Sequence, residues 1–92
     1  MDSLDFVEAV MTLEEVLGIE IPTADAEQFG SPREMVDWVE YHLRNYRPSI
    51  QTAALLRGIA KSRGDPKLAE GLDSGIRREQ IAAIIGEMFR DL

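Results

Sequence analysis

The sequence predicts an all-α protein, a small helical bundle built around one core. Apolar residues recur at helical spacing in every long segment, and no stretch shows the alternation of apolar and polar residues that marks a strand. The serines, prolines and glycines between these segments are typical of helix starts and stops. A chain of 92 residues is long enough for one hydrophobic core but not for two.

The first predicted helix covers residues 3–17. Its apolar stripe consists of Phe6, Val7, Val10, Leu13 and Leu17. Ser3 is placed to cap the start of this helix, and Gly18 is placed to end it. After an extended connector that ends at a proline, residues 23–29 predict one or two helical turns capped by Thr23.

Ser31 and Pro32 predict the N-cap and the first residue of the next helix, which runs to about Asn45. Its buried side is predicted to hold Met35, Val36, Val39, Leu43 and Tyr46. Residues 50–62 predict a further helix, which the glycine at position 58 weakens. Residues 63–75 hold four glycines or prolines and predict a loop with one helical turn.

The last predicted helix covers residues 76–92 and is strongly amphipathic. The segment Asp73-Ser74-Gly75 predicts its N-terminal cap. One face of this helix consists of Ile81, Ile84, Ile85, Met88, Phe89 and Leu92. We therefore expect this face to pack against the rest of the bundle.

The net charge of −7 is unevenly distributed. Residues 1–46 carry −9 and residues 47–92 carry +2. An acidic front half disfavours nucleic acid and anionic membranes as partners, and it favours basic proteins. A plainer interpretation is that the acidic residues only keep the protein soluble. No apolar run approaches the roughly 20 residues of a membrane-spanning helix, so we expect no membrane insertion and a cytoplasmic location.

The composition indicates a protein that is not an enzyme. The chain has no cysteine, so a thiol needed for its function must arrive on a cofactor. His42 is the only histidine, and its spacing suggests a structural residue at the border of the helix core. No carboxylate has a histidine partner or the spacing of a metal ligand, so no metal site is predicted.

The motif Asp2-Ser3-Leu4-Asp5 leads directly into the acidic first helix. Together with the pieces that follow, it resembles the acyl carrier proteins of fatty acid and polyketide synthesis. The resemblance covers residues 2–46, and its further pieces are Leu13-Glu14-Glu15, Gly18-Ile19-Glu20-Ile21-Pro22, Ala26-Glu27 and the last helix of that segment. It implies a small bundle of the acyl-carrier type.

The resemblance implies that Ser3, flanked by Asp2 and Leu4, carries 4′-phosphopantetheine that a phosphopantetheinyl transferase takes from coenzyme A. The arm then holds acyl groups as thioesters. A hydroxyl at a helix N-terminus suits this role, because a phosphodiester formed there faces unpaired backbone N–H groups and the positive end of the helix dipole. The alternative is that Ser3 only caps the helix.

A surface for partner enzymes is predicted along the first helix, opposite its core stripe. Asp5, Glu8 and Glu15 lie on that side, and Leu4 and Met11 border it. The resemblance implies that acyl-transfer and condensing enzymes read such positions through basic patches. The docking residues so predicted are Asp5, Glu8, Met11, Glu14, Glu15, Glu20 and Glu27. A merely solvated helix face is the alternative.

The resemblance also implies an acyl cleft. Its residues are Val7, Val10, Leu13, Ile21, Ala26 and Phe29. Core packing alone explains these apolar side chains equally well.

The chain departs from the family before its motif, where an ordinary carrier has a whole helix and this chain has one methionine. The helix at residues 76–92 is the candidate substitute for that missing helix. It follows an acyl-carrier-like segment at 1–46 and a helical connection at 47–75. It can fold back within its own chain, like a circular permutant, or pack into a neighbour as a swapped homodimer. We favour the monomer, because intramolecular closure of such a loop is cheap. A third alternative makes Met1 an internal residue of a longer protein.

Two hypotheses of function follow. The first is a non-catalytic carrier of acyl or biosynthetic intermediates in fatty acid, polyketide or related synthesis. The second is an unmodified interaction module that keeps the carrier fold and binds a partner enzyme through its acidic face.

Overall fold

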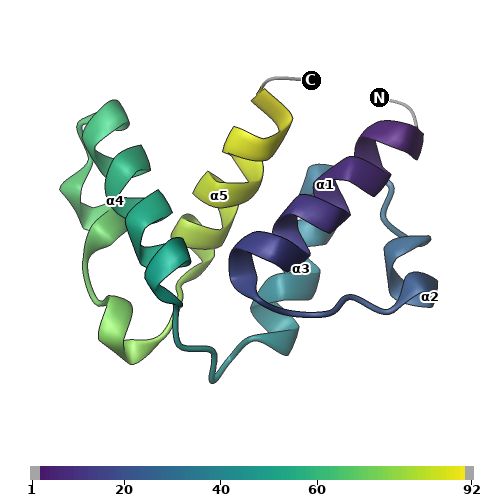
Figure 1. Ribbon diagram of the computed structural model, residues 1–92, viewed down its shortest axis with the longest axis horizontal. Helices are drawn as coiled ribbons and strands as arrows, with labels where there is room; N and C mark the ends of the chain where they lie inside the picture. Colours follow the sequence, from purple (N-terminus) through teal and green to yellow (C-terminus); the bar gives the residue numbers. More distant parts are fainter. Residues whose placement is uncertain (1–2, 91–92) are drawn as a thin grey trace.

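The computed structural model describes residues 3–90, with side chains from Phe6 to Phe89, and these residues are all-α (Figure 1). The elements are α1 (Ser3–Leu17), α2 (Thr23–Ala26), α3 (Pro32–His42), α4 (Ile50–Arg63), the 3₁₀ turns η1 (Pro66–Ala69) and η2 (Leu72–Ser74), and α5 (Arg78–Arg90). No strand occurs in this range. The all-α class predicted from the apolar periodicity is therefore confirmed.

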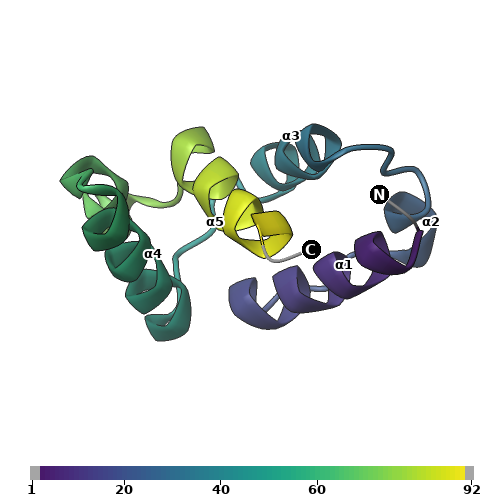
Figure 2. The same cartoon turned by 90° about the horizontal axis from the view of Figure 1, so that it is seen from above.

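α5 is the central helix of the bundle. It lies between α4 on one side and α1 and α3 on the other, an order that is also seen from above in Figure 2. α5 runs antiparallel to α1, so the end of α5 and the start of α1 lie at the same end of the bundle (Figure 1). There the ring of Phe89 meets Phe6 edge to face, with 5.6 Å between the ring centroids. The last helix thus packs against α1 in the chain that the structure describes.

One hydrophobic core joins α1, α3, α4 and α5. Its fully buried members from α5 are Ile81, Ile84 and Ile85, each 1% exposed. The facing residues are Leu13 and Leu17 of α1, Met35 and Val39 of α3, and Leu56 and Ile59 of α4. Met88 and Phe89 are half-buried against this core, whereas Leu92 lies outside the described residues.

Glycine ends two of the helices as C-terminal caps. Gly18 has φ +67°, and the next amide, of Ile19, donates to the Glu14 carbonyl oxygen at 3.1 Å. Gly64 ends α4 in the same way, with φ +66° and a 2.9 Å bond from the Asp65 amide to the Ala60 carbonyl. Side chains with a Cβ rarely adopt this left-handed conformation, so glycine suits both positions.

Serine caps start α3 and α4. Ser31 Oγ accepts a hydrogen bond from the Glu34 amide at 3.4 Å, and the first helical residue after it is Pro32, as predicted. Ser49 Oγ accepts from the Thr52 amide at 3.1 Å. α4 continues through Gly58 although glycine has a low helix propensity. The helix is stabilised by this cap, by its end at Gly64 and by four buried side chains.

Three local predictions were wrong. Thr23 does not cap α2: the N-cap is Pro22, and α2 ends at Ala26, so it is shorter than the predicted segment. α3 ends at His42 and not near Asn45, because Leu43 leaves the helical region with φ −111° and ψ 36° and the chain turns toward α1.

The third concerns the loop before α5, which forms two 3₁₀ turns and not one helical turn. Ser74 belongs to η2, and α5 begins only at Arg78, so Asp73-Ser74-Gly75 is not its cap. No helix in the described part of the chain is both long and apolar enough to cross a membrane.

Candidate functional site

Ser3 is the first residue of α1. It thus lies within the first helical turn and not before it. The first amides of a helix of 15 residues have no intrahelical acceptor, and they carry the positive end of the helix dipole. A phosphate ester on this serine would therefore lie at a position that favours negative charge. Asp2 lies outside the described residues, and the side chains of Ser3, Leu4 and Asp5 are not described either.

The middle of α1 exposes two large apolar side chains. Val7 is 53% exposed and Met11 is 63% exposed. Glu8 and Glu15 are exposed on the same helix. Val7 was also expected in the core stripe, and its exposure corrects that prediction: the stripe turns away from the core at this residue, where α1 borders a surface depression.

That depression has a volume of about 430 Å³ and lies between α1, the connector after it and α2. Its walls consist of Phe6, Val7, Val10, Met11, Glu14, Ile21, Thr23, Ala26, Glu27 and Phe29. Five of the six residues assigned to an acyl cleft line it. The sixth, Leu13, is 1% exposed and belongs to the core. The walls are mostly apolar, so the depression can hold an alkyl chain.

The acidic residues predicted for docking differ in their surroundings. Glu14 has an internal role, because its Oε2 accepts a hydrogen bond from the Ile21 amide at 2.9 Å. This bond fixes the extended connector against α1 and so shapes the depression. Glu20 and Glu27 are exposed, and Glu27 stands at the edge of the depression.

The C-terminal end of α1 is held by side chains from beyond residue 45. Thr52 of α4 is fully buried, and its Oγ1 donates to the Val16 carbonyl oxygen at 2.7 Å. The Tyr46 hydroxyl donates to the Leu17 carbonyl oxygen at 2.6 Å. These bonds satisfy carbonyls that a helix end leaves without partners. Sequence reasoning missed this contact, since no local pattern connects residues so far apart in the chain.

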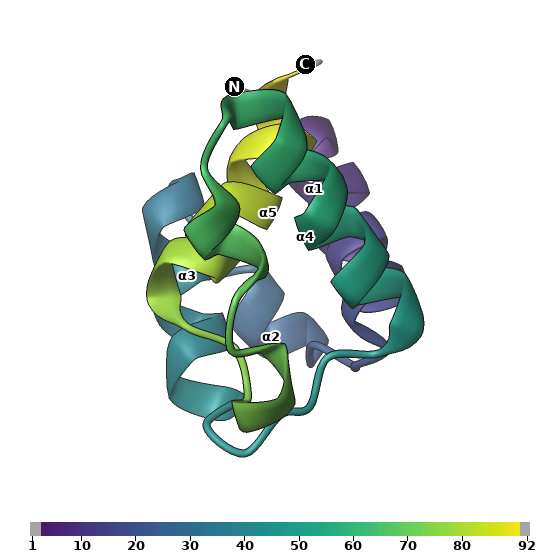
Figure 3. The ribbon, with the colours of Figure 1, turned by 90° about the vertical axis from the view of Figure 1, so that its left-hand side faces the viewer.

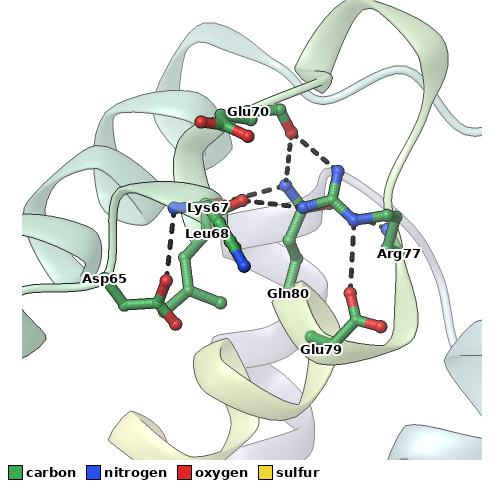
Figure 4. A network of polar contacts seen from close by, with 7 residues as sticks. All are labelled: Asp65, Lys67, Leu68, Glu70, Arg77, Glu79 and Gln80. Carbon is green, nitrogen blue, oxygen red and sulfur yellow. Dashed lines mark hydrogen bonds and ion pairs between the residues drawn. The ribbon is translucent and has the colours of Figure 1, made fainter.

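A second missed network anchors α5, which in turn supports α1 (Figure 4). Gln80 is fully buried; its Oε1 accepts from the Arg77 amide at 2.8 Å, as the third residue does in a capping box. Its Nε2 donates to the carbonyls of Leu68 and Glu70, both at 3.1 Å. The Arg77 guanidinium donates to the carbonyls of Lys67 and Glu70 at 2.7 and 2.8 Å. The η1 segment is thus tied to the start of α5, and it lies beside α4 (Figure 3).

His42 is not at the border of the core, as its spacing suggested. The ring is exposed and stacks on Trp38, with 4.1 Å between the centroids. His42 is the last residue of α3 and lies on the surface of the bundle. No group of three histidine, aspartate or glutamate side chains among the described residues is arranged to hold a metal ion.

Comparisons with known proteins agree on the front part of the chain. Residues 1–39 match the family model described as a phosphopantetheine attachment site. The acyl carrier protein of Rubrobacter xylanophilus is 51% identical over 41 residues, which are 45% of this chain and 51% of that protein. The acyl carrier protein of Campylobacter hominis is 54% identical over 39 residues, 42% of this chain and 49% of that protein.

The acyl carrier protein of Lactobacillus johnsonii gives a similar match, 49% identical over 41 residues, 45% of this chain and 51% of that protein. The chain thus spans about half the length of the curated relatives it matches. No solved structure matches it significantly. The front of this chain is therefore similar to acyl carrier proteins, and residues 1–39 match a family described by its covalent phosphopantetheine attachment site.

Proposed function

We propose that this chain is a non-catalytic acyl carrier in which Ser3 bears 4′-phosphopantetheine. The match of residues 1–39 to a phosphopantetheine attachment site carries the proposal. That segment contains two serines, Ser3 and Ser31. Ser31 caps α3, where its hydroxyl accepts a hydrogen bond from the Glu34 amide. Ser3 stands in the Asp2-Ser3-Leu4 motif through which this segment resembles the carrier proteins, so it is the serine proposed for attachment.

The residues around Ser3 fit such a group. The free amides of the first turn of α1 suit its phosphate, and the apolar depression begins at Phe6 and Val7, one turn further along the helix. When bound, the group supplies a thiol that forms thioesters, which a chain without cysteine cannot supply itself. We propose that the depression shelters the acyl chain, with Val7, Val10, Ile21, Ala26 and Phe29 as its apolar walls.

The outward face of α1 is the proposed docking surface for partner enzymes. Its exposed Met11 offers apolar contact, and Glu8 and Glu15 offer negative charge for basic patches. Charge steers such encounters and apolar contact prolongs them. The proposed partners are a phosphopantetheinyl transferase and acyl-transfer or condensing enzymes of fatty acid, polyketide or related synthesis, in the cytoplasm.

We also propose that α5 completes the carrier bundle. Residues 1–46 provide the carrier segment, residues 47–75 provide the connection, and α5 covers the apolar sides of α1 and α3. This single-domain arrangement is supported by the buried isoleucines of α5 and by Phe6 against Phe89.

Enzymatic labelling tests the attachment. The purified protein is incubated with a broad-specificity phosphopantetheinyl transferase and a fluorescent coenzyme A, and the label is read on a denaturing gel. We expect label on the wild type and on Ser31→Ala, and none on Ser3→Ala. A correctly folded wild type that takes no label would instead favour an unmodified interaction module that uses the same acidic face.

A further inference from the structure

A depression of about 420 Å³ lies between α2 and α3, and none of its lining residues comes from α1. It combines carboxylates with aromatic rings. The carboxylates are Asp25, Glu34 and Asp37, and the rings include Trp38, Tyr41 and His42. We call it the α2–α3 depression. Neither the attachment serine nor the proposed acyl cleft explains this combination.

The rings of this depression are held in place although they lie at the surface. Trp38 donates its indole N–H to Asp25 Oδ2 at 2.9 Å, and His42 stacks on it with an interplanar angle of 18°. Nδ1 of His42 lies 2.9 Å from the Trp38 carbonyl oxygen, which fixes the imidazole as well. Tyr41 meets His42 edge to face and remains 66% exposed. Such preorganised rings lose little freedom when a ligand binds.

The three carboxylates keep capacity for a further partner. Glu34 accepts from the Gly30 amide at 2.9 Å, and Asp37 is 2.7 Å from Arg78. A carboxylate has about four acceptor positions, so one internal bond does not exhaust it. Arg78 also pairs with Glu40 at 3.1 Å, and its single charge is therefore shared between two acids. The lining thus carries excess negative charge.

A contact within the chain indicates that a guanidinium suits these rings. The guanidinium of Arg44 lies 5.3 Å from the centroid of the Tyr41 ring. A guanidinium stacks on an aromatic face and bonds a carboxylate with two parallel N–H groups, whereas an ammonium is a compact and strongly hydrated charge. A surface of ordered rings beside carboxylates therefore complements arginine better than lysine.

We propose that the α2–α3 depression binds an arginine side chain of a basic partner protein. The guanidinium stacks on the exposed rings and pairs with Asp37 and Glu34. The depression thus gives the protein a second contact surface, on α2 and α3, besides the outward face of α1. This proposal rests on the proposed function only for the basic character of the partner. The depression can bind arginine whether or not Ser3 is modified.

Trp38 is the only tryptophan of the chain, so its fluorescence reports on this depression directly. The unmodified protein is titrated with the peptide acetyl-Gly-Arg-Gly-Arg-Gly-amide and with the same peptide carrying lysines. We expect a saturable change of the tryptophan emission, with a dissociation constant about three- to tenfold lower for the arginine peptide. No saturable change up to about 10 mM, or equal affinity for both peptides, would overturn the proposal.

Variants locate the binding. Tyr41→Ala removes an exposed ring, and Glu34→Gln with Asp37→Asn removes two charges. Each variant should bind the arginine peptide at least threefold more weakly while its circular dichroism stays native. Glu70→Gln with Asp73→Asn is the matched control at exposed positions before α5 and should change nothing. Binding lost in this control and kept in the other two variants would contradict the proposal. Because this experiment uses unmodified protein, its failure does not affect the labelling of Ser3.

Discussion

Gln80 shows how one buried polar residue determines where a helix begins. Its side chain makes three hydrogen bonds, one to the Arg77 amide and two to carbonyls of the preceding segment. A buried polar group with all its partners stabilises a fold modestly, but partners left unsatisfied cost more. The network therefore holds the 65–77 connection against the start of α5.

Gln80→Leu tests this network. The leucine fills a similar volume but removes the partner of the Arg77 amide and of the Leu68 carbonyl, whereas the Glu70 carbonyl keeps its bond from the Arg77 guanidinium. We expect a loss of about 2–4 kcal/mol in the free energy of unfolding. Urea unfolding followed by circular dichroism measures it. Glu79→Gln is the control, since that side chain is 71% exposed and its ion pair with Arg77 contributes little. An unchanged midpoint for Gln80→Leu would show that the network does not stabilise the protein.

Thr52→Val tests the contact between α4 and α1. The two side chains have the same shape, so the change removes the hydroxyl that donates to the Val16 carbonyl and also bonds the hydroxyls of Tyr46 and Ser49. We expect a loss of about 1–2 kcal/mol in the same unfolding measurement. Thr12→Val makes the same chemical change at an exposed position of α1 and should stay within about 0.5 kcal/mol of the wild type. Equal effects of the two substitutions would contradict a specific role for Thr52.

These residues were only partly predictable from the sequence. Gln80 stands four residues before Ile84, on the apolar stripe of the last helix, and a polar residue in that stripe is a signal of buried hydrogen bonding. The partners of Gln80 and Thr52 carry no such signal, because they are backbone carbonyls 10 to 36 residues away. Thr23 was assigned as a cap from its type alone, although the preceding Pro22 takes that position.

At the scale of elements, the packing of α5 matters more than its ion pairs. Arg78 bridges Asp37 and Glu40 of α3, and the hydrogen bond to Asp37 raises the pKa of Arg78, so its guanidinium stays charged. Both partners are largely exposed, and exposed ion pairs contribute little to stability. The buried isoleucines exclude water from the whole interface, and they hold α5 in place.

Ile84→Asp should therefore abolish the fold, because it places an unpaired charge among α1, α3 and α4. We expect loss of helical circular dichroism and of a cooperative melting transition. Ala82→Asp puts the same side chain on the exposed face of α5 and should leave both unchanged. A native melting curve for Ile84→Asp would refute the packing of α5 in the core.

The predicted bounds of a helix agree with the structure where the apolar periodicity is strong. They disagree where tertiary contacts determine the end of the helix. The range of α1 was predicted as it is found, since its stripe and Gly18 both act locally. α3 ends earlier than its pattern suggested, because Tyr46 must reach the Leu17 carbonyl. The shape of the apolar depression could not be predicted from the sequence. Glu14 was predicted to be a docking residue, but its carboxylate accepts a hydrogen bond from the Ile21 amide and holds the connector that forms one wall.

At the scale of the whole molecule, the two parts of the chain have different roles. The acidic front half presents α1 and the proposed attachment serine, while the rest closes the bundle through α4 and α5. The end of α5 lies beside the start of α1, so the C-terminal helix supports the turn on which Ser3 stands (Figure 1).

This arrangement predicts a monomer. Every apolar contact of α5 described above is made within one chain, and the Gln80 network keeps the connection folded against it. Sedimentation velocity over about a hundredfold range of concentration should show one species of 10.3 kDa. A stable species of twice that mass would favour exchange of α5 between two chains.

The most direct test of the central claim is the intact mass of the protein after co-expression with a broad-specificity phosphopantetheinyl transferase. We expect a gain of about 340 Da for the wild type and for Ser31→Ala, and no gain for Ser3→Ala. An unmodified wild type with native circular dichroism, or a Ser3→Ala variant that still gains this mass, would contradict it.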